Sequence, residues 1–172
     1  MRELAVASWA AFRSPDPRAL ERLLEGDTGA LPFLAPALRR HLEQFPSVAG
    51  GVSRTERQAL EAVAAGLGDP REIFRESGRR EEAPFMGDAI FWLHLRRLGG
   101  GPRPLVSIAP DPARLAGATV RLTLAGEGVP AGSVDWIDVA GTDRWLGGVR
   151  LAGARAAWRR DPRRGALVED AA

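Results

Sequence analysis

Few side chains in this chain of 172 residues are suited to chemistry. The chain has no cysteine and two histidines, His41 and His94, which both fall in segments with helical apolar spacing. All 24 basic residues are arginine, so there is no lysine to hold a nucleotide phosphate in a P-loop. These counts exclude thiolate catalysis, zinc sites that contain cysteine and a metal triad of histidines.

One acidic pair has the residue types of a general acid and base. Glu81 and Glu82 directly follow Arg79 and Arg80 in a segment that we expect to be a loop. Adjacent charges of opposite sign are more typical of a solvated surface. No serine lies in a Gly-x-Ser-x-Gly turn, so a hydrolytic triad is not expected either. We therefore predict a non-enzymatic protein with no catalytic residues, no metal ligands and no cofactor.

The clearest local signals start helices in the middle of the chain. Ser53 and Glu56 have the spacing of a capping box, which predicts a helix from Arg54 to about residue 65. Asp69-Pro70 predicts a second helix start, with an N-cap carboxylate before a proline at the first position. A third helix is expected over 88–98, followed by a hairpin of strands at 103–108 and 119–124.

Three helices and a hairpin in this order are typical of a winged helix-turn-helix. We expect its core to contain the apolar residues at helical spacing, namely Leu60, Val63, Ile73, Phe74, Ile90, Phe91 and Leu95. In this arrangement the helix at 88–98 is the recognition helix. Because only Asp88, His94, Arg96 and Arg97 are polar there, we expect it to be mostly buried.

The rest of the chain is divided into two smaller regions by turn residues. Helical spacing of apolar residues predicts an N-terminal helical segment over 1–46, and the winged-helix-like core spans 52–128. Three short strands over 132–170 are expected to form a small β-meander that packs on the core through Trp136, Trp145 and Trp158. The predicted fold class is therefore α+β and mainly helical.

Several stretches together resemble a known family over nearly the whole chain. They are SPDPRALERLL, LPFLAPALRRHLEQFPSVAGGVSRTERQALEAVAAG, REEAPFMGDAIFWLHLRRL and VDWIDVAGTDRWLGGVRL followed by WRRD. They resemble the C-terminal region of the bacterial family known as domain of unknown function 1835. The resemblance implies a separate domain ahead of this region, and it brings no catalytic residues. More loosely, LTLAGEG is similar to the LTxxG turn after the wing of bacterial winged-helix DNA-binding regulators, although Pro130 interrupts the helix expected there.

Charge is distributed unevenly along the chain, whose formal net charge is +2. From Ser53 to Leu98 eight arginines balance eight acids, whereas Arg144 to Arg164 has seven arginines and one acid, Asp161. The basic C-terminal stretch has interleaved tryptophans, as expected of a surface that follows phosphates, although arginines also serve simply to solvate an outer face. The candidate nucleic-acid-binding residues are Arg96, Arg97, Arg121, Arg144, Arg150, Arg159 and Arg160.

Two functional hypotheses follow from this sequence. The first is a winged-helix module that binds DNA non-specifically through arginines. The second is a protein-interaction or dimerisation module without nucleic-acid binding, whose partner is the implied N-terminal domain or a second copy. No apolar run approaches the roughly 18 residues needed to span a membrane, so we expect no membrane partner and a cytoplasmic location.

Overall fold

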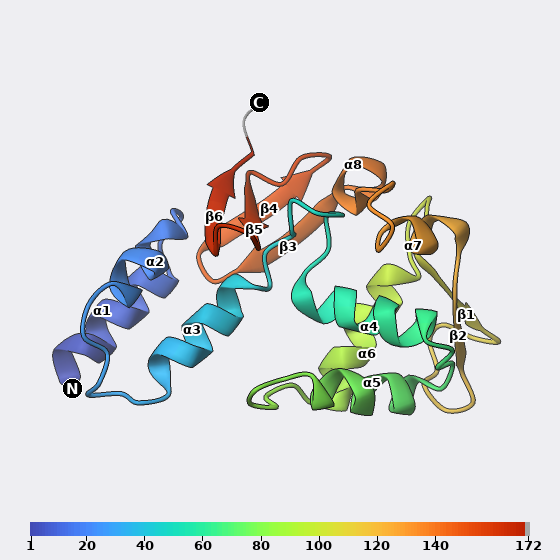
Figure 1. The fold of residues 1–172 in the computed structure, drawn as a ribbon, viewed down its shortest axis with the longest axis horizontal. Coiled ribbons are helices and arrows are strands. Elements are labelled where there is room, and N and C mark those ends of the chain that lie inside the picture. Colours follow the sequence, from blue (N-terminus) through green and yellow to red (C-terminus); the bar gives the residue numbers. More distant parts are fainter. Residues whose placement is uncertain (171–172) are drawn as a thin grey trace.

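A computed structural model describes residues 1–170, which form eight helices and three two-stranded antiparallel hairpins (Figure 1). The helices are α1 (Arg2–Phe12), α2 (Arg18–Leu24), α3 (Leu34–Leu42), α4 (Arg54–Ala64), α5 (Pro70–Arg79), α6 (Asp88–Leu98), α7 (Leu124–Gly128) and α8 (Trp136–Ala140). The strands are β1 (Val106–Ala109), β2 (Thr119–Leu122), β3 (Thr142–Leu146), β4 (Val149–Gly153), β5 (Trp158–Asp161) and β6 (Ala166–Glu169). The fold is α+β, as predicted.

The predicted caps start α4 and α5. The Ser53 hydroxyl accepts the N–H of Glu56 at 3.3 Å, and the Glu56 carboxylate accepts the N–H of Ser53 at 2.7 Å. One turn of helix thus satisfies two backbone donors with its own side chains. Asp69 caps α5 by accepting the N–H of Arg71 at 2.7 Å, with Pro70 at the first helical position. These local bonds explain why the helix starts are readable from the sequence.

Helices α4, α5 and α6 share one hydrophobic core with the β1–β2 hairpin. Six of the seven predicted core residues belong to it, with Phe74 partly buried at its edge. Ile90 was predicted wrongly, because 53% of its surface is exposed. The buried face of α6 is formed by Phe91, Leu95 and Leu98, which recur at helical spacing, and Ile90 and Leu93 lie outside it.

A second hydrophobic core joins the two ends of the chain. Leu20 and Leu42 from the N-terminal helices pack with Leu151, Trp158 and Leu167 from the C-terminal strands. Figure 1 shows these helices and strands together on one side and the α4–α6 unit on the other. The prediction that the C-terminal strands pack on the helical unit through three tryptophans is therefore wrong: Trp158 lies in the second core, Trp136 in the first, and Trp145 is 65% exposed.

The C-terminal region is two hairpins, β3–β4 and β5–β6, and not one three-stranded meander. The outer edge of β5 binds the segment before α4 instead of β4. Arg160 donates its N–H to the carbonyl of Pro46 at 2.8 Å, and its carbonyl accepts the N–H of Val48 at 2.9 Å. This parallel contact between distant segments uses the edge that a meander would have paired with β4.

Within residues 1–170, no helix is both long enough and apolar enough to span a membrane.

Candidate nucleic-acid interface

Arg144 was predicted to bind nucleic acid, but it is a buried structural residue. Its Nη1 donates to the Oε1 atom of Glu56 at 3.1 Å, and its Nη2 donates to the carbonyl oxygen of Gln44 at 3.0 Å. Only 9% of its surface is exposed. The side chain therefore joins β3 to the capping turn of α4, and it has no free face to offer a phosphate. Arg144 is therefore not a candidate phosphate ligand.

The partner of Arg144 is a carboxylate that no solvent reaches. Glu56 is completely buried and also lies 3.7 Å from Nδ1 of His94. Burial raises the pKa of the Glu56 carboxyl, but the charge of Arg144, the neighbouring His94 and the N–H of Ser53 lower it by more. The net result is a pKa far below its ordinary value, so Glu56 is ionised throughout the neutral range.

This lowered pKa predicts acid sensitivity. Because the folded pKa lies below the unfolded value of 4.5, the contribution of ionised Glu56 is present above about pH 4.5 and is lost as the pH falls further. In urea unfolding followed by circular dichroism, the stability difference between the wild type and Glu56→Gln should narrow below that pH. Burial also lowers the pKa of His41, so protonation of His41 destabilises the fold below about pH 6.5. This loss is the same in the wild type and in Glu56→Gln, so it cancels in the stability difference. A difference that stays constant from pH 6 to pH 3 contradicts this interpretation.

Arg159 is also structural. Its Nη2 donates to Asp135 at 2.6 Å, and the side chain is 10% exposed. Asp135 itself caps α8 by accepting the N–H of Ile137 at 3.0 Å. The Arg159–Asp135 pair therefore fixes α8 to β5. Arg159 is not a candidate phosphate ligand either. Arg150 does face solvent, but it is bound to Asp143 at 3.2 Å.

The predicted residues Arg96, Arg97 and Arg121 are exposed and have no carboxylate partner within the described residues. Arg96 and Arg97 end α6, and Arg121 lies on β2, where its buried neighbour Val120 faces the core. Arg103 and Arg114, which were not predicted as site residues, are exposed and unpaired in the same region. The stretch 96–123 thus has five exposed arginines and a single acid, Asp111.

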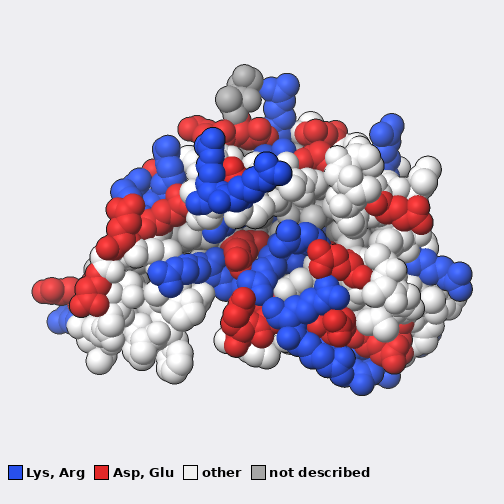
Figure 2. All heavy atoms as spheres, in the orientation of Figure 1, with Lys and Arg blue, Asp and Glu red and all other residues white. Residues whose placement is uncertain are grey.

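All but one of the arginines of α4 and α5 are near carboxylates, and the exception is Arg71. Arg54 contacts Glu43 at 2.8 Å and Glu82 at 2.9 Å, and Arg80 contacts Glu61 at 2.8 Å. Figure 2 shows basic and acidic side chains side by side over this part of the surface. Arginines that are already ion-paired neutralise few phosphates and so release few of the counterions condensed on a nucleic acid. Apart from Arg71 on α5, the unpaired positive charge of the helical unit therefore lies on the end of α6 and on the β1–β2 hairpin, within the described residues.

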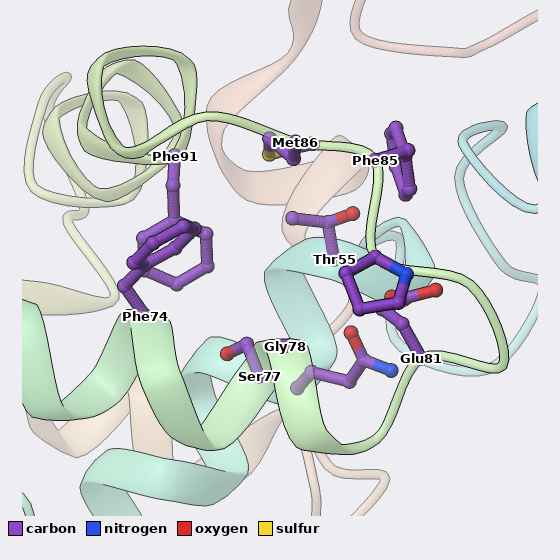
Figure 3. A pocket seen from close by; sticks show the side chains of 10 residues that line it. Thr55, Phe74, Ser77, Gly78, Glu81, Phe85, Met86 and Phe91 are labelled. Carbon is purple, nitrogen blue, oxygen red and sulfur yellow. The ribbon is translucent and has the colours of Figure 1, made fainter.

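The acidic pair Glu81-Glu82 does not have the arrangement of a general acid and base. Both oxygens of Glu81 accept from the guanidinium of Arg40, at 2.6 and 2.7 Å, and the Glu81 side chain is 8% exposed. Glu82 is 78% exposed and pairs with Arg54. Figure 3 shows the cavity beside Glu81, which is bordered by Phe74 and Phe91. The volume of this cavity is about 50 Å³. A cavity of this size has room for a water molecule or two but not for an organic substrate.

Residues 1–170 contain no group of three or more His, Asp or Glu side chains arranged to hold a metal ion.

Comparisons of the chain with models of protein families, with curated proteins and with solved structures found no match. The resemblance to domain of unknown function 1835 therefore stays a prediction.

Proposed function

We propose that this chain is a non-enzymatic winged-helix module that binds the phosphate backbone of nucleic acid through the arginines of α6 and the β1–β2 hairpin. The observation that carries the proposal is the uneven distribution of unpaired arginines over the helical unit. The arginines of α4 and α5 are ion-paired except for Arg71, whereas five exposed arginines over 96–123 share one acid. Affinity for DNA depends on such unpaired cations, because they release condensed counterions from the phosphates.

The order of elements supports this mode of binding. In winged-helix proteins the third helix lies in the major groove and the hairpin contacts the backbone beside it. Here α6 packs against β1 in one core, and the N–H of Leu105 after α6 donates to the carbonyl of Leu98 at 2.8 Å. One feature departs from the standard motif, because the connection between α5 and α6 covers residues 80–87 and not three or four residues.

The proposed binding is independent of sequence. Base readout in the major groove needs hydrogen-bonding side chains on the first turns of the recognition helix. The exposed side chains there are Asp88, Ala89, Ile90 and Leu93, and only Asp88 has a hydrogen-bonding group, which already accepts the N–H of Ala89 at 2.7 Å. The arginines begin only in the last turn, where a guanidinium binds phosphate oxygens in pairs. Affinity from phosphates alone does not distinguish one duplex from another.

A salt titration tests the proposal. We expect the parent chain to bind a duplex of arbitrary sequence, with an affinity that falls steeply as salt rises. Each phosphate contact contributes about 0.9 to the slope of log affinity against log salt, so Arg96→Gln with Arg97→Gln should reduce that slope by about 1.8. Fluorescence anisotropy between about 50 and 200 mM salt covers the useful range.

The matched control removes two exposed arginines from α5. Arg75→Gln with Arg79→Gln changes the net charge equally, but these side chains are paired with Glu72 and Glu76. The control should leave the slope nearly unchanged. Equal slope losses in the two variants would show that only net charge matters, and no affinity in the parent at about 50 mM salt would reject nucleic-acid binding.

The second candidate function is a protein-interaction module, favoured by one feature of the same helix. Ile90 and Leu93 are each 53% exposed on α6 and form an apolar strip next to the arginines. If this strip pairs two copies of the chain, sedimentation velocity will show a dimer that Leu93→Glu converts to a monomer. Leu124→Glu is the control, because Leu124 is 85% exposed on α7. A dimer without DNA affinity would select this function over the first.

A further inference from the structure

Arg160 has a partly buried guanidinium that the described protein atoms leave without a counter-ion. Its Nε and Nη1 atoms are buried, and neither has a hydrogen-bond partner within residues 1–170. The adjacent acid, Asp161, pairs with Arg164 at 3.5 Å instead. The backbone N–H and carbonyl of Arg160 are both hydrogen-bonded to the segment before α4, at Pro46 and Val48, so the side chain leaves from a fixed position. A cation removed from water without a partner is costly, which makes this position suited to an anion.

Arg160 lines a cavity of about 100 Å³ between β5, the segment before α4 and the first turns of α4. Arg54 and Arg57 line the same cavity, together with one carboxylate, Glu43. Glu43 is already bound to Arg54 at 2.8 Å, so these two charges offset each other. Arg57 is 45% exposed, and the carboxylate that it contacts at 3.9 Å, Glu61, does not line the cavity. Two positive charges, those of Arg57 and Arg160, therefore remain in excess at the cavity.

A third donor is present at the same cavity. Ser47 is 9% exposed, and its hydroxyl oxygen accepts the N–H of Ala49 at 3.0 Å. The hydroxyl hydrogen is then free to be donated into the cavity that Ser47 lines. The volume is several times that of a water molecule but well below the roughly 300 Å³ of pockets for larger organic ligands. Donors, charge and size together suit one tetrahedral oxyanion.

We propose that this cavity binds a phosphate group, either as free inorganic phosphate or as the terminal group of a phosphomonoester. Guanidinium groups bind phosphate oxygens with paired, charge-assisted hydrogen bonds, which arginine forms better than any other side chain. The bound group would join β5 and α4, which are far apart in the sequence and belong to different hydrophobic cores. Phosphate would therefore stabilise the packing between the two cores. The inference does not depend on nucleic-acid binding, since it involves none of the arginines of residues 96–123.

Thermal unfolding of the full chain tests this site. Sodium phosphate is compared with sodium chloride at equal ionic strength, and the unfolding midpoint should rise with phosphate beyond the chloride curve and then follow saturation. In Arg57→Gln with Arg160→Gln, the phosphate curve should coincide with the chloride curve. Arg57→Gln alone, at an exposed position, should weaken phosphate affinity about tenfold, as expected for the loss of one charged hydrogen bond.

The control variant removes two charges outside the cavity, Arg75→Gln with Arg163→Gln, and it should respond to phosphate as the wild type does. Glycerol 2-phosphate separates the two sources: a shift equal to that of inorganic phosphate assigns the site to a phosphomonoester, and no shift assigns it to the free ion. The proposal is overturned if phosphate acts no more strongly than chloride on the wild type, or acts equally on the Arg57/Arg160 variant. Unchanged DNA affinity in that variant keeps this result separate from the function proposed above.

Discussion

Replacement of Arg144 by methionine should destabilise the protein by about 3 to 5 kcal/mol. The reason is not the loss of attraction alone. Glu56 is completely buried and its main counter-charge is Arg144, so the substitution leaves a buried ionised carboxylate without that counter-charge. Methionine keeps much of the length and apolar surface of the arginine stem, which separates the charge effect from packing. Urea unfolding followed by circular dichroism at pH 7 gives the free energy of unfolding.

Arg150→Met is the matched control in the same hairpin. Arg150 is 56% exposed and pairs with Asp143, which is 68% exposed, and such surface pairs contribute about 0 to 1 kcal/mol. A second variant combines Arg144→Met with Glu56→Gln. Because it no longer has the buried charge of the Glu56 carboxylate, it should recover part of the lost stability. Similar losses of stability for Arg144→Met and Arg150→Met would show that the buried Glu56–Arg144 pair does not stabilise the fold more than a surface ion pair does.

Replacement of Leu95 by alanine should also be strongly destabilising, by about 2 to 5 kcal/mol. Leu95 is fully buried between α4, α5 and the β1–β2 hairpin in the core of the helical unit. The loss combines the transfer free energy of the removed methyl groups with the cavity that remains. A loss of this size is a large fraction of the stability of a typical domain, and the shift will be obvious in the urea midpoint.

Leu93→Ala on the same helix is the control for Leu95→Ala. Leu93 is 53% exposed, so its replacement should change the free energy of unfolding by about 0.5 kcal/mol or less. Helix propensity and residue type are the same in the two substitutions, and only burial differs. If Leu93→Ala proved as damaging as Leu95→Ala, then α6 would present a different face to the core from the one described.

The helix starts could be predicted from the sequence because short-range bonds determine them. Ser53 and Glu56 cap their own helix, and Asp69 and Pro70 start the next one. The failures involve contacts between residues that are far apart in sequence. Arg144 and Glu56 are separated by 88 positions, and local patterns contain no information about such a pair. The same applies to β5, which pairs along its outer edge with residues 46–48.

Charge counting located only part of the candidate interface. It found no net charge over 53–98, where Arg96 and Arg97 lie, and it favoured the stretch from Arg144 to Arg164. Counting cannot distinguish a free arginine from one that is bound to a carboxylate in the interior, as Arg144 and Arg159 are. The stretch 53–98 ends with α6 and leaves out Arg103 and Arg114 in the hairpin region. A separate count over 96–123 gives five arginines against one acid. The apolar exposure of Ile90 depends on how α6 rotates against its neighbours, which only packing decides.

Solution NMR of the arginine Nε–H groups during titration with a short DNA duplex tests the proposed interface most directly. At low salt, the signals of Arg96, Arg97, Arg103, Arg114 and Arg121 should shift as the duplex is added, while those of Arg144 and Arg159 stay in place because their guanidinium groups are buried in ion pairs. Shifts confined to the C-terminal arginines Arg150, Arg155 and Arg163, or no shifts at all, would contradict the assignment of phosphate binding to α6 and the β1–β2 hairpin.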